Sequence, residues 1–433
     1  MNQMQRAAGA GTLDPSFGID GVVDFSTEAV TGIASDLLAL PDGQLLYADR
    51  PAGKGEIRLR RLQADGLVDN EFGGKGSVEI PIENGTLPNI KLSWYRNEGW
   101  LLTWTRILQD AEDADVHVVR LDLNGQPVLS FGEGGRVKFN PIELLQGKRQ
   151  QSSRTPISDY SFPLDASVQS DGKIVLAYGL IPGSQLEGGL LVRLDADGSF
   201  DKSFNDTGFL IVKLEGVAYD YNFAERVVVQ TDGKILIVGK YYTAGKHNVY
   251  VARFNHDGQP DPGFNNGRTV TIAADARHCY MGGLSVRESD GAIVLAGYVS
   301  KATDHLQENM GFVSVLNANG TPNLVFNGGK PLISEMLEEG VRWDCCAWQQ
   351  DGQAIIVGGS GGRGYADPDR SVLTARFLLT GALDPSYSGQ GWATYKHSGG
   401  QAGYAGMALT EDNKLVLCCQ VYSARGCALR YLI

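Results

Sequence analysis

The chain has 433 residues, of which 42% are hydrophobic, so it is long enough to bury a large core. Its formal net charge of −12 at pH 7 argues against a protein that holds nucleic acid phosphates or an anionic membrane surface. No apolar run is long enough to span a bilayer, and the first residues lack the hydrophobic stretch of a secretory signal. We therefore expect a cytoplasmic protein without a membrane span, with signal-independent export left open.

An aromatic residue followed by a short glycine turn recurs seven times, at intervals of 55 to 73 residues. Repeats of this length indicate one supersecondary unit that is copied and stacked. The interval from the last aromatic residue, through the C-terminus and on to the first, is 63 residues, which matches the internal intervals and predicts a closed ring of seven units. The seven aromatic anchors are Phe17, Phe72, Phe131, Phe204, Phe264, Phe326 and Tyr387.

The fourth unit shows the strands that each copy is expected to form. Arg226–Gln230 and Lys234–Gly239 are β-rich runs joined by an Asp-Gly turn, which is a strong hairpin signal. A third run, Val249–Phe254, ends at a second turn, and a fourth run, Thr269–Ile272, follows the aromatic anchor. Four short strands without helical periodicity predict one small antiparallel sheet per unit.

The second turn of the seventh unit is divided between the two ends of the sequence. The last strand, Leu429–Ile433, aligns with Ala375–Leu379 of the sixth unit, and the residues that follow in that unit are matched by Ala10–Ser16. We therefore expect Gly21–Phe25 to complete the blade that the C-terminal strands begin. Such a shared blade closes the ring and leaves only short strand edges.

The same segments carry a recognisable repeat pattern. It reads Gln-x-Asp-Gly-Lys-Ile at Gln230–Ile235, Arg-Phe-Asn-x-Asp-Gly at Arg253–Gly258 and Leu-Asp-x-Ser-Phe-Gly at Leu13–Gly18. In these motifs the chain resembles the delta-60 repeat family of bacterial β-propellers over nearly its whole length, with the largest departures at Arg96–Glu98 and Asn323–Phe326. The resemblance implies a fold, and it brings no shared catalytic residue or ligand with it.

These patterns together predict an all-β fold, a seven-bladed β-propeller with four antiparallel strands per blade and the N-terminal strand completing the C-terminal blade. We expect residues 10–433 to form a single domain and residues 1–9 to be a flexible tail. We also expect a monomer that needs no cofactor and holds no metal.

Candidate ligand-binding residues lie at the expected mouth of the central channel, seven or eight positions before the hairpin turns. The repeated turns occupy one face, and the loops of variable length, where function is normally placed, open on the other. A mixed set of charges there is able to orient a polar ligand, whereas the simpler interpretation is that these side chains pair with one another. The set is Asp36, Lys91, Asp165, Glu225, Arg226 and Asp344, with His278 further out on an entry loop and Trp343 as an aromatic candidate near the variable loops.

Two functions remain open on this basis. The first is a non-catalytic binding or interaction module that presents its variable loops and channel mouth to a protein, a glycan or a small ligand. The second is a hydrolase or lyase with a polar site at the channel mouth, which would require His and carboxylate side chains to converge. We favour the binding module because only six histidines occur and because aromatic residues near the loops supply stacking surface: Trp343, Tyr241, Tyr242, Tyr365 and Tyr422.

The cysteines and the Asp-rich turns are both assigned structural roles. The spacing of the six cysteines does not repeat with the units, which favours reduced thiols over a disulfide framework. The Asp-x-Asp-Gly turns have oxygen ligands of the kind that Ca²⁺ binds, but Asn124, Asn319 and Thr380 replace the carboxylate in other copies, which favours a turn role.

One basic insertion interrupts the regular spacing. The third interval exceeds the others around Leu145–Ser158, and this stretch precedes the first strand of a unit. We expect it to lie over the channel mouth, either as a lid or partner contact or as a solvated loop.

Overall fold

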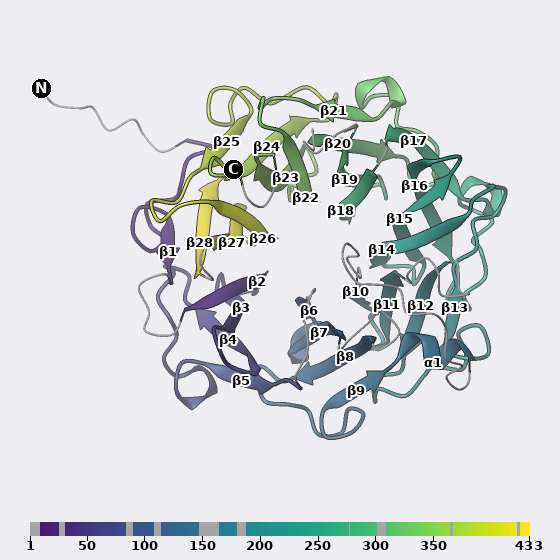
Figure 1. Cartoon of the computed structure of the whole chain (residues 1–433), viewed down its shortest axis with the longest axis horizontal. Coiled ribbons are helices and arrows are strands. Elements are labelled where there is room, and N and C mark those ends of the chain that lie inside the picture. Colours follow the sequence, from purple (N-terminus) through teal and green to yellow (C-terminus); the bar gives the residue numbers. More distant parts are fainter. Residues whose placement is uncertain are drawn as a thin grey trace, which may run out of the picture. The chain divides into compact units, whose positions relative to one another are not determined.

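The computed structural model describes residues 9–25, 31–83, 90–107, 114–146, 164–179, 188–276, 278–300, 309–363, 367–421 and 425–433. Within these ranges the strands form four-stranded antiparallel sheets, seven in all, in the orders β2-β3-β4-β5, β6-β7-β8-β9, β10-β11-β12-β13, β14-β15-β16-β17, β18-β19-β20-β21, β22-β23-β24-β25 and β1-β28-β27-β26. The chain is a seven-bladed β-propeller, as its repeats predict. Figure 1 labels the strands of each sheet.

Internal contacts divide the chain into two compact units. Unit 1 comprises Met1–Pro81, Leu306–Ser314 and Leu324–Ile433, and unit 2 comprises Ile82–His305 and Val315–Asn323. Three complete sheets of unit 1 contain β1 (Val22–Asp24), β2 (Gly32–Ala39), β3 (Leu45–Pro51), β4 (Glu56–Leu62), β5 (Val78–Pro81), β22 (Val341–Trp348), β23 (Ala354–Gly361), β24 (Ser371–Leu378), β25 (Trp392–Tyr395), β26 (Ala402–Leu409), β27 (Lys414–Val421) and β28 (Arg425–Leu432).

Unit 2 likewise holds three complete sheets. Their strands are β6 (Ile90–Trp94), β7 (Trp100–Ile107), β8 (Ala114–Leu121), β9 (Arg136–Phe139), β10 (Leu164–Val168), β11 (Ile174–Gly179), β12 (Gly189–Leu194), β13 (Phe209–Ile211), β14 (Tyr221–Val229), β15 (Ile235–Thr243), β16 (Lys246–Phe254) and β17 (Val270–Ala276). The strands of the remaining sheet are β18 (His278–Val286), β19 (Ile293–Ser300), β20 (Asn309–Leu316) and β21 (Leu332–Ser334).

Among the residues that the structure describes, helical structure is confined to short segments. The helix α1 (Pro141–Gln146) follows β9 and was not expected from the sequence, and short 3-10 turns lie at Phe72–Gly74, Arg96–Glu98, Asn265–Gly267 and Asn327–Gly329. Within the ranges that the structure describes, no helix has the length and hydrophobicity that crossing a bilayer requires.

The hairpin turns adopt the backbone conformation that their sequence predicts. Gly43 and Gly233 have φ angles of 79° and 80°, in the left-handed region that glycine enters without steric cost. Asn413, which replaces glycine in the seventh copy, has a φ of 59°. The preceding carboxylate also has a structural role, since Asp42 Oδ1 accepts a hydrogen bond of 3.1 Å from the Gln44 N–H.

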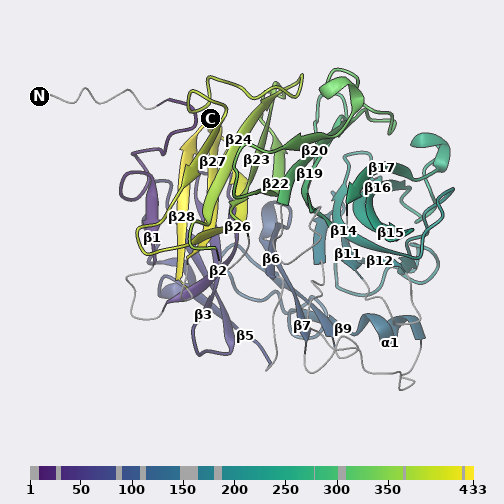
Figure 2. The same cartoon turned by 45° about the horizontal axis from the view of Figure 1, so that its top comes forward.

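The shared blade is present, and it joins the two ends of the described chain. In β1, Val22 lies opposite Leu429 and Asp24 lies opposite Cys427 of β28, in antiparallel register. Figure 2 shows β1 and β28 side by side at the edge of this sheet. The prediction that Gly21–Phe25 would complete the C-terminal blade is confirmed, with the strand limited to the three central residues of that range.

A buried arginine, an aspartate and an aromatic anchor form a unit that we call the Arg–Asp clasp. In the shared blade the Arg430 guanidinium lies 4.6 Å over the ring of Phe17, and its Nε donates to Asp14 Oδ2 at 2.8 Å. Asp14 Oδ1 accepts hydrogen bonds from the N–H and the hydroxyl of Ser16 at 3.0 and 2.7 Å. Equivalent clasps are Arg61–Asp69, Arg193–Asp201, Arg253–Asp261 and Arg376–Asp384.

In three of the clasps, those of Arg193, Arg253 and Arg430, the arginine also contacts the next blade. A terminal nitrogen of Arg430 donates to the carbonyl of Ala64 in the next blade, and Arg253 donates to the carbonyl of Ala318 at 2.8 Å. The residue after the anchor adds a backbone bond to the next blade, as between Gly18 N and Asp65 O at 2.7 Å. Within the described residues this backbone bond recurs after Phe131, Phe204, Phe264, Phe326 and Tyr387.

The anchors themselves are core residues. All seven side chains are 0 to 1% exposed. The glycine of the second turn in the next blade packs on them so closely that a Cβ at Gly66 would lie 3.0 Å from the Phe17 ring and 2.6 Å from Val23 Cγ2. The spacing of the blades thus depends on the absence of a side chain at this glycine.

The clasp predicts a pH dependence of stability. Burial raises the pKa of Asp14, but the hydrogen bonds from Ser16 and Lys414 and the charge of Arg430 outweigh burial and lower this pKa to about 2. Because the unfolded pKa is about 4, the carboxylate contributes stability that is complete above that pH and is lost as the pH falls toward about 2. Urea titrations should show this loss in the wild type, and Asp14→Asn should cost about 2–4 kcal/mol at neutral pH and flatten the profile.

Asp65→Asn is the matched control for this change. It makes the same substitution at an exposed turn carboxylate, and asparagine occupies the equivalent position in other copies, at Asn124 and Asn319. We expect its free energy of unfolding to stay within about 0.5 kcal/mol of the wild type. Equal losses in the two variants would show that the clasp carries no special stability.

Alanine at two glycines should separate backbone strain from the close approach of blades. Gly66 and Gly233 have φ angles of 88° and 80°, so alanine at either position incurs the cost of a left-handed conformation, about 1–2 kcal/mol. Only Gly66 also faces atoms within 3 Å, whereas nothing lies within 4 Å at Gly233. We expect Gly66→Ala to lose about 1–3 kcal/mol more than Gly233→Ala in urea titrations; equal effects would mean that the junction yields without cost.

Candidate functional site

Three of the predicted site residues belong to unit 1, and two of them lie close together. Asp36 is buried on β2, where its Oδ1 lies 2.5 Å from the position that a Cβ of Gly406 would take. Asp344 is on β22, and both carboxylates act on Tyr404 of β26. Burial first, then the Cys345 thiol and these two carboxylates, raise the pKa of Tyr404 well above its usual value.

Trp343 lies in the core instead. Its side chain is 0% exposed, its ring lies edge-on to Phe377 at 6.4 Å, and its indole N–H donates to Ser334 Oγ at 3.2 Å. The structure therefore separates Trp343 from the neighbouring Asp344, which is only partly buried.

The other five predicted residues belong to unit 2, where several of them link consecutive blades. Asp165 Oδ2 accepts the N–H of Val227 at 2.9 Å, and Arg226 Nε donates to the carbonyl of Gly282 at 2.7 Å. Lys91 is partly buried in β6, opposite Thr103 of β7. The side chains of Asp165 and Arg226 thus bond to backbone groups of the neighbouring blade, which differs from a pairing of charged side chains with one another.

Glu225 is positioned by a β-bulge. The register of β14 on β15 shifts between Ala224 and Arg226, so Glu225 is the extra residue of the bulge. Its side chain therefore does not follow the regular alternation of side chains between the two faces of the sheet. Glu225 Oε1 lies 3.2 Å from Lys240 Nζ, and its Oε2 accepts the N–H of Met281 at 2.9 Å. The carboxylate is buried, and both of its oxygens are engaged.

His278 belongs to a group of rings that we call the aromatic cluster. Tyr221, Tyr242 and His247 lie opposite one another on β14, β15 and β16, so they share one face of the sheet. The rings of Tyr221 and Tyr242 stack with centroids 5.0 Å apart and planes 8° apart, and His247 lies 5.1 Å from Tyr242 and 5.9 Å from His278. The cluster comprises Tyr221, Tyr242, His247, His278, Tyr280 and Tyr298, all of them partly exposed.

The Lys240–Glu225 pair forms the base of this cluster. Lys240 Nζ lies 4.0 Å over the ring of Tyr280 and 5.0 Å over that of Phe223, and Tyr280 in turn stacks on Tyr298 at 4.9 Å. A buried ammonium is stable here because a carboxylate and two aromatic faces replace its water. The cluster thus has a charge-balanced base beneath partly exposed rings.

The cluster lies at the strand ends opposite the repeated hairpin turn. Tyr221 begins β14, His278 begins β18 and Tyr242 is next to the end of β15. The Asp-Gly turn between β14 and β15 lies at the opposite end of these strands, at Asp232 and Gly233.

Sequence reasoning found part of this cluster. It named Tyr242 and His278 but missed Tyr221, His247, Tyr280 and Tyr298, which become neighbours only through the cross-strand register. Tyr241, also named, points to the other face of its strand and is 8% exposed. Tyr365, Tyr422 and the basic insertion beyond Gln146 lie outside the described residues.

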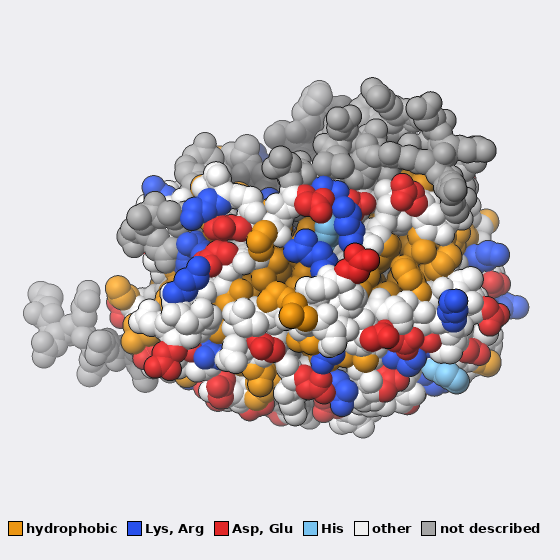
Figure 3. Space-filling view, turned by 90° about the horizontal axis from the view of Figure 1, so that it is seen from below, with side chains coloured by type: hydrophobic (Ala, Val, Ile, Leu, Met, Phe, Trp, Pro, Cys, Tyr) orange, Lys and Arg blue, Asp and Glu red, His pale blue; other side chains and the backbone are white. Residues whose placement is uncertain are grey.

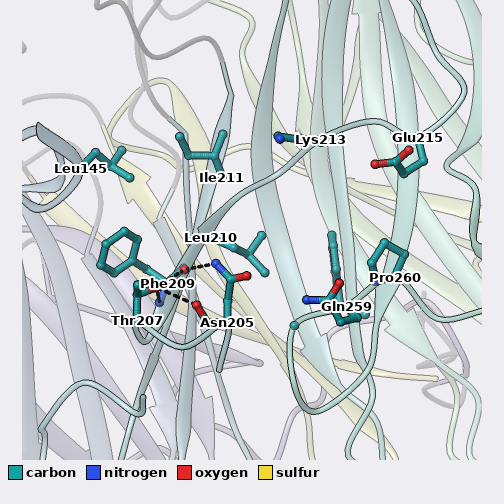
Figure 4. Close-up of a pocket in the computed structure, with 12 residues that line it drawn as sticks. Leu145, Asn205, Thr207, Phe209, Leu210, Ile211, Lys213, Glu215, Gln259 and Pro260 are labelled. Carbon is teal, nitrogen blue, oxygen red and sulfur yellow. Dashed lines mark hydrogen bonds between the residues drawn. The ribbon is translucent and has the colours of Figure 1, made fainter. Parts of the chain in front are cut away.

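A separate pocket of about 420 Å³ lies beside the outer strand of the third blade (Figure 4). Leu145 of α1 lines one side, and Gln259 and Pro260 from the second turn of the fourth blade line the other, with Phe209–Ile211 of β13 between them. No sequence motif predicts this pocket, because three separate segments form it.

On the side of the molecule that Figure 3 shows, the charged side chains do not form a single field. Figure 3 shows acidic and basic side chains interspersed, with hydrophobic side chains between them, on the side of the molecule in view. Among the residues that the structure describes, no group of three or more His, Cys, Asp or Glu side chains is arranged to hold a metal ion.

Comparisons with known proteins agree on the fold. A family model described as a domain of unknown function (DUF5122) beta-propeller matches residues 169–204 and 230–264, in the third and fourth blades. No curated protein matches the sequence. Among solved structures, polysaccharide lyase Uly1 superposes with a TM-score of 0.50 and 10% identity, over 95% of this chain and 98% of that chain.

The RRP9 WD40 repeats superpose with a TM-score of 0.47 and 7% identity, over 95% of this chain and 97% of that chain. At 10% identity the likeness to Uly1 extends to the fold alone.

A double-mutant cycle should measure the coupling at the base of the cluster. Glu225→Gln leaves the buried Lys240 ammonium without its carboxylate, and we expect a loss of about 2–4 kcal/mol in the free energy of unfolding. Lys240→Met in the same chain removes the unpaired charge and should restore part of that loss, which urea titrations of the two single variants and the double variant will show. Strictly additive losses would contradict a direct ion pair.

Proposed function

We propose that the protein is a non-catalytic binding module and that the aromatic cluster binds a neutral oligosaccharide. The observation that carries the proposal is the stack of Tyr221 on Tyr242, with His247 and His278 beside it, all partly exposed on the face opposite the repeated turns. Flat rings with polar edges offer both apolar contact and hydrogen bonds to one ligand.

The chemistry of the cluster fits a sugar in two respects. Pyranose rings have apolar C–H faces that stack on aromatic side chains, and their hydroxyl groups both donate and accept, as do tyrosine hydroxyls and imidazole nitrogens. Aromatic side chains also keep only two rotatable χ angles, so ordering them on binding costs little entropy.

The electrostatics favour a ligand without charge. Lys240 is already neutralised by Glu225 at 3.2 Å, so the cation at the base is not available to an anionic ligand. The net charge of −12 adds a general repulsion toward polyanions. These two features support neutral glycans over uronate-containing or sulfated ones.

Titration with oligosaccharides tests the proposal. The full chain is screened against neutral oligosaccharides of glucose, mannose, xylose and galactose, and the best binder is measured by isothermal titration calorimetry. Tyr242→Ala removes the central ring of the stack, and we expect its Kd to rise about tenfold or more.

The matched control is Tyr395→Ala. Tyr395 also lies edge-on to a histidine, His397, at 6.3 Å, but it is on β25 in unit 1 and outside the cluster. Its Kd should equal that of the wild type. Equal losses in both variants, or no binding to any of the sugars, would reject the glycan site.

An enzyme that acts at the same cluster is the second candidate. The specific observation in its favour is the His247–His278 pair, whose ring centroids are 5.9 Å apart, because two imidazoles at this distance are able to act as acid and base on one substrate. The likeness to the polysaccharide lyase Uly1, at 10% identity, supports a shared fold and no shared activity. New reducing ends or unsaturated products from the bound sugar, abolished in His278→Ala, would favour the enzyme over the binding module.

We also propose that the repeats belong to the delta-60 family. The support is the repeated Arg-x-x-x-Asp-Gly and Leu-Asp-x-Ser-Phe pattern together with the match of two blades to a propeller repeat model.

A further inference from the structure

We propose a second binding site, independent of the aromatic cluster: the outer edge of β13 and the pocket beside it bind an extended peptide segment of a partner protein by strand addition. The peptide pairs with Ile211 through its backbone, and its side chains enter the pocket on both sides of the edge. Strand addition of this kind takes its affinity from main-chain hydrogen bonds and its specificity from side-chain pockets.

The hydrogen-bond pattern of β13 leaves one end of its edge open. The Arg193 N–H of β12 donates to the Gly208 carbonyl, and the Val212 N–H donates to the Gly189 carbonyl of β12. The backbone groups of Gly208, Leu210 and Val212 therefore face β12. Antiparallel pairing alternates, so the N–H and C=O of Phe209 and of Ile211 point outward.

The two outward residues differ in how they are satisfied. The carbonyl of Phe209 accepts from Asn205 Nδ2 at 2.9 Å and from Thr207 Oγ1 at 2.8 Å, so side chains of the preceding turn cap this part of the edge. The outward backbone groups of Ile211 form no hydrogen bond with any of the described residues. The protein thus blocks half of a short edge and leaves the other half free to pair.

The pocket lies on both sides of this open edge. The side chain of Phe209 packs with Leu145 against the core between the second and third blades, whereas Leu210 packs with Phe254 on the opposite face of the sheet. All four residues line the pocket, and Figure 4 shows the strand residues between Leu145 on one side and Pro260 on the other. A strand added at Ile211 alternates its side chains between these two faces, so the pocket receives both sets.

Charged residues extend the site beyond the end of β13. Lys213 and Glu215 line the same pocket, both are exposed, and neither forms an ion pair among the described residues. An acidic side chain in the bound peptide would complement Lys213. The partner we infer is therefore an extended segment with alternating apolar and polar residues and an acidic residue at the position that faces Lys213.

The probe for this site is an acetylated octapeptide of alternating valine and threonine that ends in glutamate. Its binding to the full chain is followed by fluorescence anisotropy of a labelled form and by amide hydrogen exchange. We expect saturable binding and slower exchange of the Ile211 amide. The matched peptide with N-methylated central amides has the same side chains but cannot donate backbone hydrogen bonds, and we expect it not to bind.

Two variants locate the site on the protein. Ile211→Pro removes an outward N–H, a change that edge strands tolerate, and should weaken binding about tenfold or more. Lys213→Glu should weaken it about fivefold, while Lys202→Glu, the same change at an exposed lysine outside the pocket, should leave it unchanged. The proposal is overturned if the unmethylated peptide fails to bind, if both peptides bind equally, or if Lys202→Glu weakens binding as much as Lys213→Glu.

Discussion

A guanidinium group that is buried over an aromatic ring must find an acceptor for its N–H groups, because an unpaired buried charge costs about 3–5 kcal/mol. In the Arg–Asp clasp a carboxylate, a serine hydroxyl and a carbonyl of the next blade meet this requirement, as Arg430 shows with Asp14, Ser16 and Ala64. Because one acceptor belongs to the next blade, the hydrogen bonds that satisfy the buried guanidinium also set the distance between the two blades. At this distance a side chain at Gly66 of the next blade would meet the Phe17 ring, so glycine is required there.

The copies that depart from the repeat support this dependence. In the second blade Val128 stands where other copies have the aspartate, and Arg120 pairs with Glu98 at 2.6 Å and lies 4.1 Å over the ring of Tyr95. In the fifth blade the arginine and the aspartate are both absent, with Val315 and Asn323 at their positions. The arginine is thus either given another carboxylate or lost together with its partner, and neither copy keeps a charge without a counterion.

The fold could be predicted from the sequence because its signals are local and repeated. Turn glycines, alternating strands and the divided seventh turn each specify backbone structure within a few residues, and seven copies reinforce one another.

The residues of the site depend on relations that spacing does not show. A one-residue bulge at Glu225 redirects a side chain, and Trp343 enters the core because Gly311 has no side chain where the indole nitrogen lies, 2.3 Å from a hypothetical Cβ. Cross-strand register, which no linear motif records, brings Tyr221 to Tyr242.

The two ends of the strands differ in sequence because the Arg–Asp clasps lie at only one of them. Turns that carry the clasps are constrained in length and sequence, because each must present a glycine, a carbonyl and an N–H to its neighbour. The opposite strand ends carry no repeated clasp, and there the tyrosines and histidines of the aromatic cluster lie in the fourth and fifth blades.

The sheet that contains β1 and β28 has a kinetic consequence. Val22 pairs with Leu429, so this sheet joins strands that lie near the two ends of the described chain. Contacts of such large sequence separation form late, because the entropy of closing a long loop must be met before the contact contributes anything. We therefore expect β1 to acquire its partner strand late in folding, after the strands of the intervening blades have paired with their neighbours in the sequence.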